Sequence, residues 1–309
     1  MLPKSPSRTV LRLMSLRYLA DAHVSSSGRR SRFFSTIARC LQIGLLSLPV
    51  WSAAAQQLSS RVQGASDQEV PIPTSSHNPL GYSDASARAE LTAYKVATGG
   101  SGWTSMTASG KISYDGTAET LPASLLILPG NRAKLDVTKP DGHDTTVYNG
   151  NRGSITHSGS KKVLLAPRGA ACGFAPFDLP LHAAQGGQQF SIVDHGSMLL
   201  EGTTLRRISV EVAIPQKDLF PYEKEDRSVV DMYFDPATHL LMKTASLVPI
   251  PGSSRPVLLK VNNYSGYQRT GRFLLPTTID ETINGQTIWK LVLSSLDVTK
   301  APAKEDFAF

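Results

Sequence analysis

The segment Arg207–Val212 reads RISVEV and alternates polar with apolar side chains without a break. Successive side chains of a strand point to opposite faces, so this alternation predicts a strand with one buried and one outer face. The same period of two recurs over 106–165 and 190–293. Tight turns separate these segments, among them Asn149-Gly150 and Asn284-Gly285, and Asn-Gly favours the type I′ turn that joins antiparallel strands. We count about ten or eleven strands.

A sheet of this size cannot stay flat and must curl or close. A helix is expected at its N-terminal side, because Ala87, Leu91 and Tyr94 share one helical face between a possible N-cap at Asp84 and a stop at Gly99-Gly100. Residues 170–187 are apolar and proline-rich and interrupt the strand pattern. The predicted fold class is therefore α+β, mainly β: a curled antiparallel half-barrel with an N-terminal helix and a helical or irregular lid.

The positive charge of the chain is concentrated at its N-terminus. The sequence has 309 residues and a formal net charge of +7. Residues 1–55 contain eight basic residues and one acidic residue, Asp21, which leaves 24 of each sign in 56–309. Nucleic-acid binding needs an excess of cations to displace counterions, so the neutral remainder argues against a nucleic-acid partner. The apolar fraction of 40% excludes disorder as the main state.

The order of features in this basic segment is that of a signal peptide. A positive flank, Arg29–Arg39, precedes an apolar run, Leu41–Trp51, and the small residues of Ser52–Ala55. The run is shorter than the roughly 20 residues that span a bilayer. We predict a signal peptide over 1–55, cleavage after Ala55, and export to the periplasm. The alternatives are a mitochondrial presequence, favoured by the Arg- and Ser-rich start, and a twin-arginine signal at Arg29-Arg30.

Cleavage would leave Cys172 as the one cysteine, so no intramolecular disulfide could form. Its apolar neighbours favour a small buried side chain over a reactive thiol. Residues 56–82 are rich in Gln, Ser, Pro and Asn, and we expect a flexible polar lead-in. Residues 83–309 are predicted to form one half-barrel domain.

Patterns that carry catalysis or metal binding are missing from the sequence. A nucleophile elbow reads Gly-x-Ser-x-Gly after a strand, and Gly99–Gly102 lacks that spacing. Asp194 and His195 are neighbours on a predicted strand and would point to opposite faces. Ser158 and Ser160, which flank a glycine after a histidine, are the serines left to consider. No metal-ligand spacing or phosphate-binding glycine loop occurs. We expect no enzyme activity, no cofactor and no metal.

Two stretches carry a family resemblance. The first, Gly130–Arg152, has the order of a "Pro-Gly-x-Arg" strand, a proline turn and an Asn-Gly turn before an apolar strand. The second, Asn263–Val298, follows the order "Tyr … Gly … Pro-x-x-Ile", with Phe307 near the end. Together they resemble the periplasmic lipoprotein-carrier superfamily (LolA/LolB-like), over most of 84–309.

The resemblance implies a half-barrel whose mouth is closed by helices and whose inner face receives acyl chains. It also implies that a strand arginine contacts the lid helices. Arg132 matches that position best, and the alternative is an exposed strand arginine. Eleven apolar residues are candidates for the lining of the ligand-binding cavity, and the alternative for each is an ordinary place in the core. They are Leu126, Leu128, Leu135, Val163, Leu165, Phe174, Phe177, Leu181, Met232, Phe234 and Trp289.

The leading hypothesis is a non-enzymatic periplasmic binding or carrier protein for lipid or lipoprotein acyl chains. Burying an acyl chain contributes about 0.8 kcal/mol per CH₂, so binding requires an apolar cavity and no catalytic group. The alternative is a periplasmic sensor or protein-interaction module on the same fold, which would bind an envelope protein. A hydrolase is the third hypothesis. The proline-rich insert and the longer region Phe190–Asp226 distinguish this chain from the carriers.

Overall fold

The part of the chain that the computed structural model describes lies within the unit Gln68–Phe309. The described residues are 69–100, 102–115, 117, 119–130, 132–149, 152–165, 175–213, 227–249 and 257–298. The predicted signal peptide and its cleavage site lie outside them, as does Cys172.

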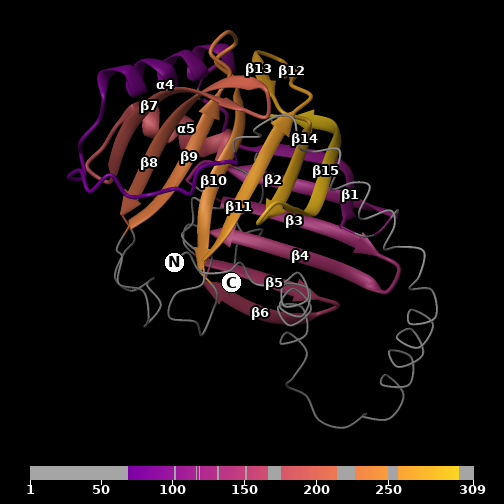
Figure 1. Ribbon diagram of the computed structural model, residues 1–309. Helices are drawn as coiled ribbons and strands as arrows, with labels where there is room; N and C mark the ends of the chain where they lie inside the picture. The colour runs from indigo at the N-terminus through magenta and orange to yellow at the C-terminus, as the bar shows by residue number, and fades with distance from the viewer. Residues whose placement is uncertain are drawn as a thin grey trace, which may run out of the picture. The chain divides into compact units, whose positions relative to one another are not determined.

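Thirteen strands of this unit form one antiparallel sheet in the order β6-β5-β4-β3-β2-β1-β15-β14-β11-β10-β9-β8-β7, and β12 pairs with β13 in a separate hairpin. Strands β2–β5 run across the view of Figure 1 while β9–β11 run upright, so the sheet curls. Its edge strands β6 and β7 do not pair, and the barrel stays open. The strands are β1 (Met106–Tyr114), β2 (Thr120–Leu128), β3 (Arg132–Lys139), β4 (Gly142–Asn149), β5 (Arg152–His157), β6 (Ser160–Leu165), β7 (Phe190–Leu200), β8 (Thr203–Ala213), β9 (Arg227–Phe234), β10 (Leu241–Pro249), β11 (Val257–Ser265), β12 (Gln268–Thr270), β13 (Phe273–Leu275), β14 (Thr278–Ile283) and β15 (Gln286–Asp297).

The predicted fold class is confirmed, and the sheet is larger than the ten or eleven strands expected. Within the predicted strand region 190–293, the segment 273–283 is divided into β13 and β14 at Pro276-Thr277. Proline has no N–H to donate to a strand ladder, which favours a break there. The short polar segments β4 and β5 also pair over their full lengths through backbone hydrogen bonds that do not depend on apolar alternation.

The two faces of the sheet carry separate apolar clusters. The main cluster lies on the face that we call the inner face, and it includes Ile127, Met232 and Leu291. Smaller clusters lie on the outer face, one around Tyr233 and Val261 and one of Leu128, Val147 and the partly buried Leu126. The sheet is therefore buried on both sides over part of its area.

Helix α4 (Ala85–Ala97) buries the face that the sequence predicted, with Leu91 fully buried and Tyr94 packed edge-to-face on Phe234 at 5.6 Å between ring centroids. Asp84 holds the N-cap position, but its side chain makes no capping hydrogen bond. Its Oδ2 instead accepts a hydrogen bond from the backbone N–H of Asp194 on β7, at 2.9 Å. The carboxylate thus ties the start of the helix to the sheet.

The C-terminal end of α4 is joined to the β12–β13 hairpin. The backbone N–H of Leu274 donates to the carbonyl of Thr98 at 3.1 Å. Gly99 follows with a φ of +88°, and a Cβ there would lie 2.1 Å from the carbonyl oxygen of Arg272. Glycine is required at this position both by the left-handed backbone and by the close approach of the hairpin.

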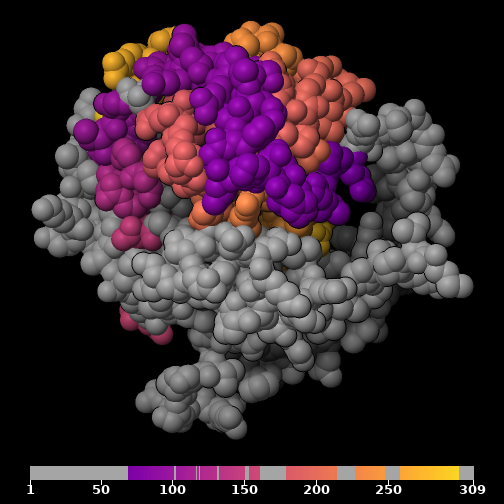
Figure 2. Space-filling model, turned by 90° about the vertical axis from the view of Figure 1, so that its left-hand side faces the viewer, coloured from indigo at the N-terminus to yellow at the C-terminus, as the bar shows by residue number. Residues whose placement is uncertain are grey.

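Helix α5 (Ala175–Gln185) forms the helical part of the predicted lid and packs against α4. Pro180, Leu181 and Ala183 are its described buried residues. In Figure 2 the indigo N-terminal part of the described chain, which includes α4, lies across the salmon and orange segments of the second half of the chain. The two helices therefore cover one end of the inner face.

The part of the predicted lead-in that is described, residues 69–82, makes hydrogen bonds to the sheet. Glu211 on β8 accepts hydrogen bonds from the backbone N–H of Ser76 at 2.5 Å and from the Ser75 hydroxyl at 3.0 Å. Arg227 also hydrogen-bonds the backbone carbonyl of Asn78. The polar composition suggested flexibility, but here the serines are the hydrogen-bonding partners of a buried carboxylate. The boundaries 1–55, 56–82 and 83–309 stay predictions.

Candidate functional site

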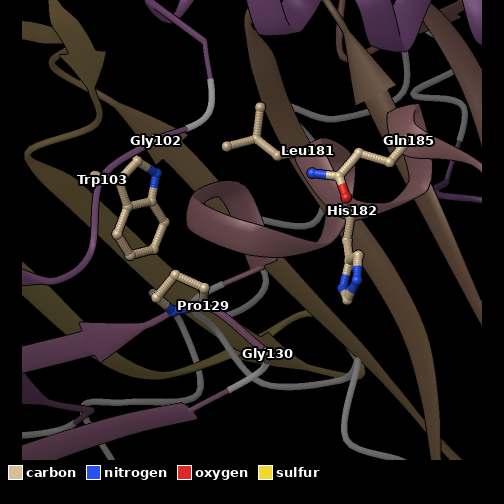
Figure 3. Close-up of a pocket in the computed structure, with 7 residues that line it drawn as sticks. All are labelled: Gly102, Trp103, Pro129, Gly130, Leu181, His182 and Gln185. Carbon is tan, nitrogen blue, oxygen red and sulfur yellow. The ribbon is translucent and has the colours of Figure 1, made fainter.

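A pocket of about 230 Å³ opens beside helix α5 (Figure 3). Three segments that are far apart in sequence form it: the approach to β1, the turn between β2 and β3, and α5. The lining residues are Gly102, Trp103, Pro129, Gly130, Leu181, His182 and Gln185.

The pocket has an apolar side and a polar side. Trp103 is 8% exposed and Leu181 is 7% exposed, and Figure 3 shows their side chains and Pro129 around the same space. His182 and Gln185 come from the outer side of α5, and the His182 ring packs edge-to-face on Phe190 at 5.8 Å. Ligand pockets usually measure about 300–1,000 Å³, so this volume accommodates part of an acyl chain. Binding of a whole acyl chain at this site would require α5 to move.

The inner face below the helices contains several of the residues predicted from sequence. Met232 and Phe234 are fully buried in the main cluster, together with Leu181. Leu135 and Trp289 are partly buried and pack against it. The structure thus brings five of the candidates to one face, and ligand binding by them stays a prediction.

Leu126 and Leu128 are on the outer face, apart from these five. The register pairs Leu125 with Ala108 and with Leu135, both of which contact the main cluster, so Leu126 points the other way. The run Leu125–Leu128 is apolar at every position, and its alternation could not assign a face. Phe174 lies outside the described residues, as do the side chains of Val163, Leu165 and Phe177.

Arg132 donates from Nε to the carbonyl of Pro129, at 3.0 Å, and so supports the turn that borders the pocket. Another strand arginine, Arg206 on β8, contacts helix α4. Its Nη1 lies 3.2 Å from Oε2 of Glu90, and its Nη2 lies 2.6 Å from Oδ2 of Asp194. The sequence did not identify Arg206, because its partners are distant along the chain.

Glu90 is the centre of this contact. This charged residue lies on the apolar face of α4 and is therefore only 2% exposed. His239, in the turn between β9 and β10, donates to Oε1 of Glu90 at 2.9 Å. Burial raises the pKa of Asp194, but hydrogen bonds from Arg206, Ser86 and a backbone N–H outweigh it and lower the pKa to about 2. We call Glu90, Asp194, Arg206 and His239 the α4 clamp.

The inner face also has a polar part that the sequence analysis missed. The register aligns Met232, Thr244, Asn262, Glu281 and Trp289 across five neighbouring strands. Thr244, Asn262 and Glu281 of this row are at most 8% exposed. A period of two ordinarily assigns polar residues to the outer face, and these three side chains depart from that pattern.

A serine–histidine contact occurs on the outer face. Nε2 of His195 lies 2.7 Å from Oγ of Ser209, and this hydroxyl donates to Oδ1 of Asp231 at 2.5 Å. A catalytic triad places the histidine between serine and carboxylate, whereas here the serine is in the middle and is 1% exposed. Burial, then the charge of Arg207, lowers the pKa of His195, and burial raises that of Asp231. Ser209 and Asp231 therefore belong to a buried structural network, which the exposed His195 joins from the surface.

Asp194 and His195 have different partners, as the strand geometry predicted. Within the described residues, no group of three or more His, Cys, Asp or Glu side chains is placed to hold a metal ion. None of the helices in the described part of the chain is long and apolar enough to cross a membrane.

No family model and no curated protein matches the chain, whereas solved structures do. An outer-membrane lipoprotein-sorting protein domain from Vibrio parahaemolyticus is 13% identical, with a TM-score of 0.45, over 72% of this chain and 96% of that one. A LolA superfamily protein from Nitrosomonas europaea is 10% identical, with a TM-score of 0.44, over 72% and 97%. A DUF1329 family protein from Desulfovibrio piger is 10% identical, with a TM-score of 0.45, over 75% and 98%.

Proposed function

We propose that the chain is an exported, non-enzymatic binding or carrier protein for lipid or lipoprotein acyl chains. One observation supports this most directly: the curled sheet carries its main apolar cluster on the inner face, and one end of that face is covered by two short helices with a pocket at their margin. Such a face can exchange its contacts with the helices for contacts with an apolar ligand.

The pocket marks where the ligand would enter. Leu181 belongs both to the pocket and to the main cluster, so a chain that passes Trp103 and displaces α5 would reach Met232 and Phe234. Each buried CH₂ contributes about 0.8 kcal/mol, which offsets the loss of the helix contacts when the chain is long enough. Lid displacement of this kind is a common way to admit a ligand.

Two measurements test the proposal. Native mass spectrometry after gentle purification should reveal bound lipid, and titration with a fluorescent fatty acid should show saturable uptake. Leu181→Arg places a charge at the pocket and should weaken uptake at least about tenfold, since losing contact with two CH₂ groups already has that effect. Leu199→Arg, at an exposed leucine of β7, is the matched control and should bind normally.

Blank lipid assays would overturn the proposal. A pulldown that then recovered one stoichiometric envelope protein would support the alternative, a sensor or interaction module on the same fold. Retained ester hydrolysis in a Ser158→Ala, Ser160→Ala variant would exclude those serines as nucleophiles. Export can be checked separately by fractionation and by N-terminal sequencing of the mature chain, which is expected to begin at Gln56.

A further inference from the structure

The polar part of the inner face borders the apolar part directly. Asn262 is two residues from Tyr264 on β11, a distance of about 7 Å along a strand, and both point to the inner face. Across the sheet, Thr244 is the partner of Asn262 on β10 and Glu281 is its partner on β14. An amphiphile whose tail lay on the apolar part would therefore place its polar end near Asn262.

The charges in this region cancel. Nζ of Lys260 lies 2.6 Å from Oε2 of Glu281, and the side chain of each is 11% exposed. The remaining groups of the row, on Thr244 and Asn262, are neutral. A free carboxylate or phosphate brought here would find its nearest cation already paired, and burying an unmatched charge is costly.

Asn262 lacks one hydrogen bond. Its Nδ2 lies 3.4 Å from Oγ1 of Thr244, while its Oδ1 is buried and has no donor among the residues that the structure describes. The residue is 2% exposed, so water does not replace that donor freely. A buried acceptor without a partner is unfavourable, and a ligand that donates a hydrogen bond would relieve it.

From the unpaired oxygen, the paired charges and the adjoining apolar face, we infer that the polar end of the ligand is recognised at Asn262 and is uncharged and hydroxyl-bearing. This inference rests on the proposed acyl-chain binding and specifies its ligand class: neutral amphiphiles of the acylglycerol type, with a hydroxyl that donates to Oδ1 of Asn262. The alcohol oxygen can accept a hydrogen bond in turn from the neighbouring hydroxyl of Thr244.

Competition against a bound fluorescent fatty acid tests this with three ligands of one chain length. They are 1-monooleoylglycerol, which has free hydroxyls, methyl oleate, which has no donor, and oleate, which is charged. The wild-type protein should bind 1-monooleoylglycerol about three- to tenfold more tightly than methyl oleate, the effect of one net hydrogen bond. Oleate should bind no better than methyl oleate.

The variant Asn262→Leu should abolish that preference by weakening 1-monooleoylglycerol alone. Asn263→Leu is the matched control, because Asn263 is the next residue of β11, points to the other face and also has an Oδ1 without a donor. It should leave both affinities unchanged. If Asn262→Leu does not unfold cooperatively, the ranking of the three ligands by the wild type decides the question.

Equal affinity of the wild type for 1-monooleoylglycerol and methyl oleate would overturn the inference while leaving acyl-chain binding intact. The same holds if oleate binds most tightly, or if Asn262→Leu weakens all three ligands equally. Failure of every ligand to displace the probe, together with absent probe binding, would instead overturn the proposed function.

Discussion

Helix α4 should depend for much of its attachment on one buried carboxylate, and Glu90→Gln tests this. The substitution keeps the shape of the side chain and removes its charge. Glu90 is 2% exposed and accepts hydrogen bonds from Arg206 at 3.2 Å and from His239 at 2.9 Å. A glutamine can offer its single oxygen to one of these donors, and its NH₂ group then faces the other.

The expected loss follows from these two contacts. A hydrogen bond to a charged group contributes about 1.5–3 kcal/mol when buried. The side chains of Arg206 and His239 are 28% and 40% exposed, so solvent reduces each contribution. Arg206 also keeps Asp194 as a partner. We therefore expect Glu90→Gln to lower the free energy of unfolding by about 2 kcal/mol, or Tm by about 4–8 °C for a domain of this size.

Urea unfolding followed by circular dichroism measures this value. Glu201→Gln is the matched control, because Glu201 pairs with Lys243 at 2.8 Å but is 63% exposed, and an exposed pair contributes less than about 1 kcal/mol. A double-mutant cycle with Arg206→Met should give a coupling energy of about 1–2 kcal/mol. A loss of less than about 0.5 kcal/mol in Glu90→Gln, equal to the control, would refute the assignment of the clamp.

Gly99→Ala should lower the free energy of unfolding by about 3 kcal/mol or more, from backbone strain at φ +88° and from a Cβ 2.1 Å from the carbonyl oxygen of Arg272. Gly271→Ala, at φ +58° with nothing within 4 Å, should cost about 1–2 kcal/mol, and equal losses in urea unfolding would contradict the close approach. The pKa of Asp194 is about 2 in the folded state against 3.8 ordinarily, so its stabilising contribution is present above pH 3.8 and is lost as the pH falls toward 2. Asp194→Asn should flatten the fall in urea midpoint over that window, and an unchanged slope would show that the Arg206 contact is not formed.

The sequence predicts the sheet well where alternation is strict and fails where composition gives no period. In β8 the alternation of Ile208, Val210 and Val212 assigns these side chains to the inner face correctly, although Ser209 and Glu211 on the other face are buried as well. In β2 the run Leu125–Leu128 is apolar throughout, and only its pairing with Ala108 decides that Leu126 is on the outer face. Strand faces in such runs depend on register, which is set by partners that are distant in sequence.

The sequence predicted the apolar residues of the candidate site but not its polar residues. Apolar candidates such as Met232 are found at the inner face, since burial follows from hydrophobicity. The α4 clamp and the row at Asn262 were missed, because they consist of polar residues that ordinarily lie at a surface. Glu90 falls on the apolar face of a helix, and that conflict between pattern and residue type was the available signal.

Two buried polar groups of the sheet differ in their pairing, and the unpaired one borders the main apolar cluster. On the outer face, both oxygens of Asp231 have donors, Ser209 at 2.5 Å and Arg207 at 2.7 Å, as expected of a structural network. On the inner face, Oδ1 of Asn262 has none, which costs about 1–3 kcal/mol relative to a paired acceptor. Valine or leucine in its place would remove that cost and extend the apolar face. Without ligand, a domain with an unpaired acceptor beside an apolar surface is less stable than the same domain with an apolar residue at that position. An amphiphile that donates a hydrogen bond to the acceptor would stabilise the folded domain when it binds.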